Sequence, residues 1–158
     1  MNIASTQFTL KTNSFEIYLS GCSGNPKCEG CHNPILWNFN CGSNWIYEID
    51  SIVEKINDFG TLVKNVWILG GEPLDQDYKE FITMIKRIRN QTRRINLWLF
   101  TRFEFDEIDT DIIKLFDYIK CGRYEPSLIT ENNIQYGIKL ATSNQQVKHI
   151  KQENQIKC

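Results

Sequence analysis

The chain has 158 residues, of which 41% are hydrophobic and 23% are charged, and its formal net charge is −1. This length suits one domain with a real core, and the composition is not that of a disordered chain. A nearly neutral charge carries no electrostatic signature of nucleic-acid binding, so we expect no nucleic acid among the partners. We also expect no membrane association, because no apolar stretch approaches the roughly 18 residues of a membrane span.

Whether cysteines form disulfides or bind metals depends on the compartment in which the protein resides. Residues 1–12 are polar and lack the charged and then apolar layout of a secretory signal, so we predict a cytoplasmic location. The chain contains six cysteines. In a reducing compartment, clustered cysteines are more often metal ligands or catalytic groups than disulfides.

Strand and helix patterns alternate along the chain. Short runs rich in aromatic and branched residues predict strands over 15–20, 66–69, 95–100 and 118–121. Apolar residues at helical spacing predict helices over 50–59, 77–89 and 106–116. After residue 122 the pattern weakens, with a candidate strand over 134–140 and a polar tail from about residue 145.

This alternation favours an α/β fold with a mostly parallel sheet in a single domain. A closed barrel of eight strand–helix units typically needs about 200 residues or more. The chain is shorter than that, so we expect a partial, open (β/α) barrel of about four to six units.

Three cysteines lie in a loop directly after the first predicted strand. Cys22, Cys28 and Cys31 have the spacing C-x5-C-x2-C, and the glycines among them let the backbone wrap closely around a compact object. Thiolates at such spacing suit zinc or an iron–sulfur cluster. Structural zinc would need a fourth ligand, for which His32 or Cys41 is available. A cluster held by three thiolates leaves one iron open to a ligand, and we favour it over zinc and over three unrelated core cysteines.

A second glycine-rich turn follows the second predicted strand, as Gly70-Gly71-Glu72-Pro73-Leu74. Glycines at the carboxyl end of a parallel strand allow a ligand to approach the backbone, and Glu72 could meet an ammonium group. An ordinary strand-to-helix turn is the alternative. Because the carboxyl ends of parallel strands share one edge, we expect this turn and the cysteine loop to converge.

The two motifs together resemble the radical S-adenosylmethionine superfamily, and within it the activating proteins of anaerobic ribonucleotide reductase. The usual superfamily spacing is C-x3-C-x2-C, so the first cysteine interval is two residues longer here. Weaker similarities continue over most of the chain. The matching segments are 21–22, 28–34, 36–37, 70–74, 99–101, 117–124 and 143–145.

The resemblance implies one radical S-adenosylmethionine domain over residues 1–158, in an oxidoreductase of anaerobic metabolism. It implies a [4Fe–4S] cluster on the three cysteines of the loop and S-adenosyl-L-methionine as a second cofactor. By the same resemblance, the residues expected near S-adenosylmethionine are Gly70, Gly71, Glu72 and Thr101.

The implied reaction is reductive cleavage of S-adenosylmethionine to a 5′-deoxyadenosyl radical. That radical would generate a glycyl radical on the large subunit of anaerobic ribonucleotide reductase, with a flavodoxin or ferredoxin as electron donor. Two alternatives remain open from the sequence. One is a radical S-adenosylmethionine enzyme acting on a small molecule or peptide, and the other is a zinc-binding or electron-transfer module.

Overall fold

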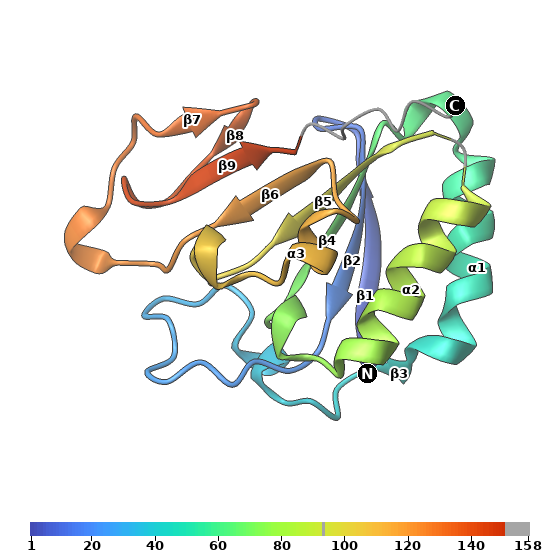
Figure 1. The fold of residues 1–158 in the computed structure, drawn as a ribbon, viewed down its shortest axis with the longest axis horizontal. Helices are drawn as coiled ribbons and strands as arrows, with labels where there is room; N and C mark the ends of the chain where they lie inside the picture. The colour runs from blue at the N-terminus through green and yellow to red at the C-terminus, as the bar shows by residue number, and fades with distance from the viewer. Residues whose placement is uncertain (93, 151–158) are drawn as a thin grey trace.

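A computed structural model describes residues 1–92 and 94–150 of the chain (Figure 1). Its main sheet has the strand order β3-β1-β2-β4-β5-β6-β9. The bounds of these strands are β1 (Asn2–Thr9), β2 (Ser14–Leu19), β3 (Ser43–Asn44), β4 (Asn65–Gly70), β5 (Asn96–Phe100), β6 (Tyr118–Cys121) and β9 (Gln146–His149).

The centre of the sheet is parallel and its edges are antiparallel. Strands β2, β4, β5 and β6 pair in parallel, whereas β1, β3 and β9 run antiparallel to their neighbours. Figure 1 shows helices α1 (Trp45–Asp58) and α2 (Tyr78–Gln91) side by side on one face of the sheet. They connect β2 to β4 and β4 to β5, so each connection is a β-α-β crossover of the kind that parallel strands require.

Both helices start at a capping side chain. The Asn44 side chain accepts a hydrogen bond from the Ile46 N–H at 3.0 Å, and Asp77 accepts one from the Glu80 N–H at 2.9 Å. Such caps satisfy amide groups that the first turn leaves without partners. One stripe of each helix is buried against the sheet, and these residues are Ile49, Ile52, Val53, Ile56, Phe81, Met84, Ile85 and Ile88.

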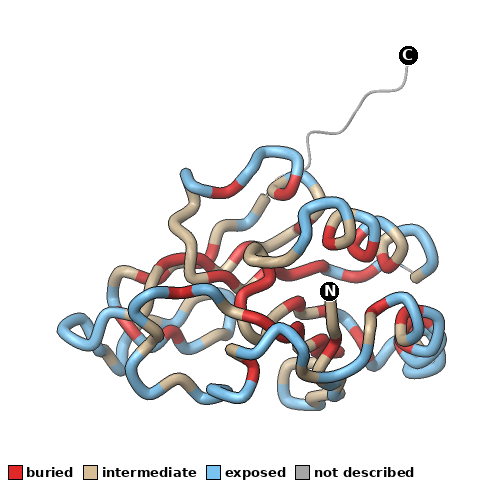
Figure 2. The backbone as a smooth tube through the Cα atoms, turned by 90° about the horizontal axis from the view of Figure 1, so that it is seen from below, coloured by how far each residue is buried: buried red, intermediate tan, exposed pale blue. Residues whose placement is uncertain are grey.

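The central strands bury the face toward the helices fully and the opposite face in part. In Figure 2 the buried positions follow the strands and one side of each helix. The face toward the helices is aliphatic, as with Ile17, Ile68 and Leu99. The opposite face is aromatic, and the rings of Trp98 and Tyr118 stack at 4.2 Å between centroids. The hairpin of β7 (Ile134–Gln135) and β8 (Ile138–Lys139) packs over part of this second face.

The structure confirms the α/β class and the four predicted strands of the parallel centre. The helix expected over 106–116 is largely wrong. A 3-10 turn (Phe105–Glu107) and the short helix α3 (Thr110–Ile113) occupy this segment. Ile108 between them is extended, and Asp109 caps α3 by accepting a hydrogen bond from the Asp111 N–H at 2.7 Å.

Three further expectations are corrected. The segment 134–140 is a hairpin instead of one strand, because Tyr136 and Gly137 have φ angles of 50° and 78° and reverse the chain. Strand β1 was not expected, because its sequence is mostly polar. The polar tail expected from about residue 145 begins with strand β9, which pairs with β6. The rest of that tail, residues 151–158 with Cys158, lies outside the described residues.

Within residues 1–92 and 94–150, no helix is both long enough and apolar enough to cross a membrane.

Candidate functional site

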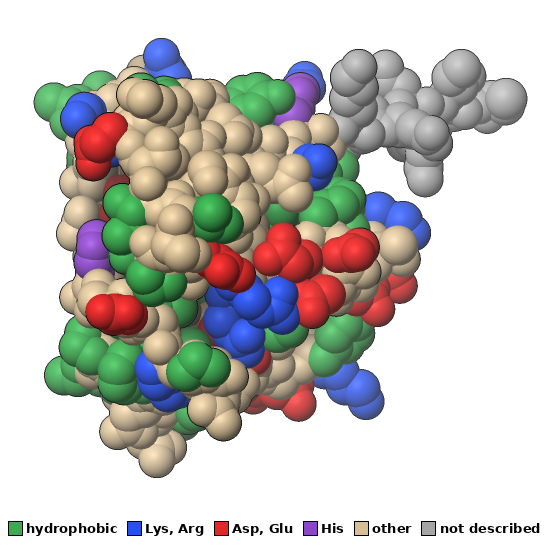
Figure 3. All heavy atoms as spheres, turned by 90° about the vertical axis from the view of Figure 1, so that its left-hand side faces the viewer, with side chains coloured by type: hydrophobic (Ala, Val, Ile, Leu, Met, Phe, Trp, Pro, Cys, Tyr) green, Lys and Arg blue, Asp and Glu red, His purple; other side chains and the backbone are tan. Residues whose placement is uncertain are grey.

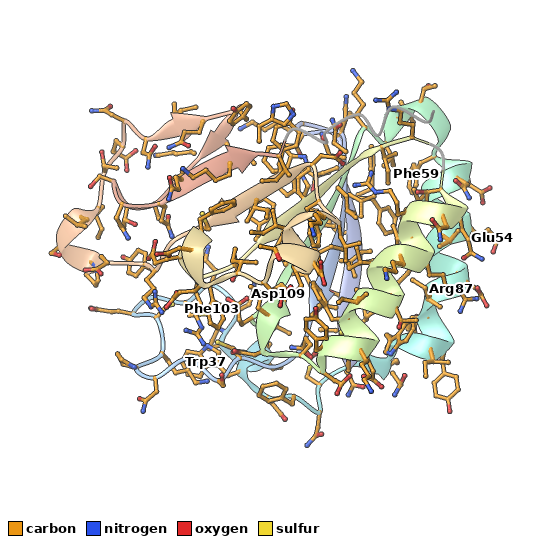
Figure 4. The ribbon with its side chains drawn as sticks, in the orientation of Figure 1. Trp37, Glu54, Phe59, Arg87, Phe103 and Asp109 are labelled. Atoms are coloured by element: carbon orange, nitrogen blue, oxygen red, sulfur yellow. The ribbon has the colours of Figure 1, made fainter. Side chains whose placement is uncertain are left out.

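The cysteine loop lies against the carboxyl ends of the parallel strands. The Gly21 N–H donates to the Leu36 carbonyl at 2.8 Å, and the Glu72 N–H donates to the Gly21 carbonyl at 2.7 Å. The first bond joins the two ends of the loop to each other, and the second joins its Gly21 end to the turn after β4. Figure 4 labels Trp37 on the loop and Phe103 just after β5, both at this end of the molecule. The convergence expected from the sequence is therefore present.

A cavity of about 280 Å³ opens between the loop and the strand ends. It brings together every residue that the sequence analysis singled out as a cluster or S-adenosylmethionine contact. Those that line it are Cys22, Cys28, Cys31, Gly70, Gly71, Glu72 and Thr101.

The donor set of this cavity is three half-buried thiols. Burial raises the pKa of the Cys28 thiol, and the nearby thiols of Cys31 and Cys22 raise it further. The two candidates for a fourth ligand lie elsewhere. His32 lines a separate hollow beside the β7–β8 hairpin, and Cys41 lines one beside β1 and β2.

The described residues bring three soft donors and no fourth to this cavity, which fits a cluster that keeps one iron open better than it fits a closed zinc site. Among the residues that the structure describes, no three His, Cys, Asp or Glu side chains are grouped tightly enough to hold a single metal ion. Three thiols spread around a cavity can instead each bind a different iron atom of one iron–sulfur cluster, because a cluster is larger than a single ion.

The two glycines after β4 are required by close backbone contacts. A Cβ on Gly71 would lie 2.2 Å from the Gly21 carbonyl oxygen and 2.7 Å from that of Leu36. Gly70 has a φ of +125°, and a Cβ there would lie 2.3 Å from the Leu19 carbonyl oxygen. Since neither position has room for a side chain, these glycines let the cysteine loop lie directly on the strand end.

Glu72 joins the ends of two neighbouring strands. Its side chain is 1% exposed and accepts hydrogen bonds from the Leu74 N–H at 3.0 Å, the Thr101 hydroxyl at 2.7 Å and the Arg102 N–H at 2.8 Å. Burial raises the pKa of this carboxyl, and the three hydrogen bonds oppose the shift by favouring the ionised form. Thr101, also buried, thus contributes to the site by holding Glu72.

The sequence analysis missed three charged residues of the site, Asp75, Arg102 and Lys120, and the first two pair with each other. Asp75 accepts a hydrogen bond from the Ser23 N–H of the cysteine loop at 2.6 Å and pairs with the Arg102 guanidinium at 3.3 Å. The sequence points to Asp75 and Arg102 only through their positions. Asp75 lies shortly after Glu72 at the end of β4, and Arg102 directly follows Thr101 at the end of β5. Together they clamp the loop from the side of β4 and β5.

Lys120 and Cys121 are adjacent on β6 and face opposite sides of the sheet. Lys120 lines the cavity, and burial lowers the pKa of its ammonium group. Cys121 packs in the core toward the helices, where burial raises its pKa to about 11. Cys121 therefore serves as a small buried residue of the core and does not line the cavity.

The outer rim of the site carries mixed charge. Figure 3 shows Lys and Arg side chains gathered beside Asp and Glu on the face to which the cysteine loop belongs. Arg123, which follows β6, pairs with Glu104 at 3.6 Å and with Glu107 at 2.9 Å. These three side chains are about two-fifths exposed, so water screens the pairs and they add little stability.

The site agrees with a comparison against protein families. A family model described as a 4Fe-4S single cluster domain matches residues 13–148. The chain belongs to this 4Fe-4S single cluster domain family. The matched range begins before β2 and ends in β9, so it includes the cysteine loop and every strand end around the cavity.

Known relatives of this 4Fe-4S single cluster domain share one name. The anaerobic ribonucleoside-triphosphate reductase-activating protein of Escherichia coli K12 is 26% identical over 140 residues, which cover 85% of this chain and 87% of that protein. The protein of the same name from Vibrio cholerae is 24% identical over 105 residues, covering 65% and 66% of the two chains. The chain is therefore similar to activating proteins over most of its length.

Proposed function

We propose that this chain is an oxidoreductase of the radical S-adenosylmethionine type that activates an anaerobic ribonucleotide reductase. In this proposal residues 1–158 form one such domain, and its parallel strands are those of a partial, open barrel. The observation that carries the proposal is the single cavity in which three cysteines meet the Gly70-Gly71-Glu72 turn. The names of the relatives support the choice of partner.

The chain's own residues have two tasks in this mechanism. Cys22, Cys28 and Cys31 would hold the cluster, and the backbone of Gly70 and Gly71 would bind the methionyl group beside it. Glu72 and Thr101 would fix that backbone through the hydrogen bond that joins their side chains. When bound, a reduced [4Fe–4S] cluster supplies the electron that cleaves S-adenosylmethionine to methionine and a 5′-deoxyadenosyl radical.

The partners follow from this chemistry. The hydrogen donor would be a backbone glycine of the reductase large subunit, which becomes the glycyl radical. A low-potential electron carrier, flavodoxin or ferredoxin, would reduce the cluster, since [4Fe–4S] centres can reach several hundred millivolts negative. We place this reaction in the cytoplasm, a reducing compartment in which the thiols stay available as cluster ligands.

The deciding experiment is anaerobic reconstitution with iron and sulfide, followed by electron paramagnetic resonance of the reduced protein. We expect a [4Fe–4S]⁺ signal that changes when S-adenosylmethionine is added, and formation of 5′-deoxyadenosine under reducing conditions. Mixing with the reductase large subunit should then give a glycyl radical signal.

Two cysteine variants provide a matched pair. Cys22→Ala should lose the cluster, whereas Cys41→Ala should keep it, because Cys41 lines a different hollow. A colourless protein that retains zinc, or a cluster whose spectrum ignores S-adenosylmethionine, would leave a metal-binding or electron-transfer module instead. Cleavage without any glycyl radical on the reductase would point to a small-molecule or peptide substrate.

A further inference from the structure

The candidate cavity contains one cation without a partner. Its charged lining side chains, apart from the thiols, are Glu72, Arg102 and Lys120. Both oxygens of Glu72 accept hydrogen bonds from within the protein, and Arg102 pairs with Asp75. In the part of the chain that the structure describes, the Lys120 ammonium has no hydrogen bond, ion pair or aromatic ring contact. It is the free charge of this cavity.

The fold holds this ammonium at the cavity in a fixed way. Lys120 is paired with Phe100 across the parallel β5–β6 ladder, and its carbonyl accepts a hydrogen bond from the Thr101 N–H at 2.9 Å. Successive residues of a strand point to opposite faces, so the core position of Cys121 directs Lys120 to the other face. The ammonium lies near enough to Glu72 and Cys28 to feel their charges.

A half-buried ammonium without an acceptor is costly, because removing a charge from water is compensated only by a partner. Two internal carboxylates act on its charge, and both already have partners: Glu72 is bonded to three donors, and Glu104 pairs with Arg123. An anionic group of a ligand is therefore the missing partner. The methionyl part of S-adenosylmethionine has one such group, its carboxylate, and its amino and sulfonium groups are cationic.

We infer that Lys120 binds the carboxylate of S-adenosylmethionine from the β6 side of the cavity, opposite the Gly70-Gly71 backbone. This inference rests on the proposed function and names a binding residue for the same site. Lysine suits the task, because an ammonium is a point charge with three donors on a flexible stem. The contact would select ligands that carry a free carboxylate.

The test is a comparison of two ligands on the reconstituted protein under anaerobic conditions. Equilibrium dissociation constants are measured for S-adenosylmethionine and for decarboxylated S-adenosylmethionine, with wild type and Lys120→Met. An open iron could also favour the carboxylate, so the decisive quantity is the change in preference between the two proteins. A lost charge-assisted hydrogen bond should reduce the preference for S-adenosylmethionine by about tenfold or more in Lys120→Met.

Lys148→Met is the matched control. Lys148 lies on the neighbouring strand β9, but its ammonium contacts the ring of Phe105 and does not line the cavity. This variant should keep the wild-type preference, and equal iron content in all three proteins excludes a folding defect.

Two results would overturn the inference while leaving the proposed function intact. One is an unchanged preference in Lys120→Met. The other is an equal loss of affinity for both ligands, which would mean that Lys120 acts on the cluster or the fold instead of the carboxylate. A loaded wild-type protein that binds neither ligand would refute the proposed function and the inference together.

Discussion

Asp75 is expected to be the main support of the cysteine loop outside the glycine turn. Its side chain is 8% exposed and makes two contacts, with the Ser23 N–H at 2.6 Å and with the Arg102 guanidinium at 3.3 Å. The first contact holds the residue after Cys22, and the second leads to the end of β5. Asp75→Ala removes both contacts and leaves the Arg102 guanidinium with only its longer ion pair to Glu72, at 4.0 Å.

The size of the effect follows from these contacts. A hydrogen bond to a charged group contributes about 1.5–3 kcal/mol. Breaking a fully buried ion pair costs about 3–5 kcal/mol, but Arg102 is 23% exposed and can recover part of its hydration. We therefore expect Asp75→Ala to lower the free energy of unfolding by about 2–4 kcal/mol. Asp75→Asn, whose amide oxygen can still accept from Ser23, should lose less.

The assay is denaturant unfolding of the cluster-free protein under reducing conditions, paired with the rate at which a chelator removes iron from the reconstituted protein. Asp77→Ala is the control, because Asp77 caps α2 two residues away without touching the loop. Losing that cap should cost about 1 kcal/mol and leave the rate of iron loss unchanged. Asp75→Ala should accelerate iron loss.

The reasoning is refuted if Asp75→Ala unfolds at the same denaturant concentration as Asp77→Ala and releases iron no faster than wild type. The Ser23 and Arg102 contacts would then contribute nothing to the loop.

Three further predictions follow from single contacts. Gly71→Ala should prevent cluster assembly, measured as iron content, because its Cβ would lie 2.2 Å from a backbone oxygen of the cysteine loop. Gly137→Ala is the control: its φ of +78° strains the turn of the β7–β8 hairpin, but its Cβ meets no other atom, so the cluster should still assemble. Cys121 has a folded pKa of about 11 against a usual 9.0, so its contribution to stability is intact below pH 9 and is lost as pH rises through about 11. The loss should reach roughly 2–3 kcal/mol and disappear in Cys121→Ala, as followed by unfolding at each pH. Arg89 donates to two backbone carbonyls and to Asp117 at 2.7 Å, and Arg89→Lys should cost about 1–2 kcal/mol in thermal unfolding because an ammonium cannot match the guanidinium fork. An unchanged melting temperature would contradict that assignment.

Structural features that depend on residues close together in the chain could be predicted from the sequence. Apolar runs and helical spacing located the four parallel strands and the two long helices, because these patterns reflect burial of one face or one stripe. The cysteine loop and the Gly70-Gly71-Glu72 turn were found from residue type and spacing. Their convergence followed from one rule of parallel sheets, in which the carboxyl ends of the strands share an edge.

Features that depend on distant partners could not be predicted. The polar sequences of β1 and β9 form strands because each pairs with a neighbouring strand, and that pairing leaves no local pattern in the chain. The helix expected over 106–116 was interrupted by a cap at Asp109, which competed with the apolar spacing.

The cavity also combines features that local sequence predicts with features that only distant contacts decide. The sequence by itself determined which soft donors and glycines the chain brings to the site. Only the tertiary structure decided that Asp75 and Arg102 clamp the loop and that Lys120 faces the cavity while Cys121 faces the core. A shift of one residue in strand register would exchange Lys120 and Cys121 between the two faces, and register is set by pairing and packing across the whole sheet.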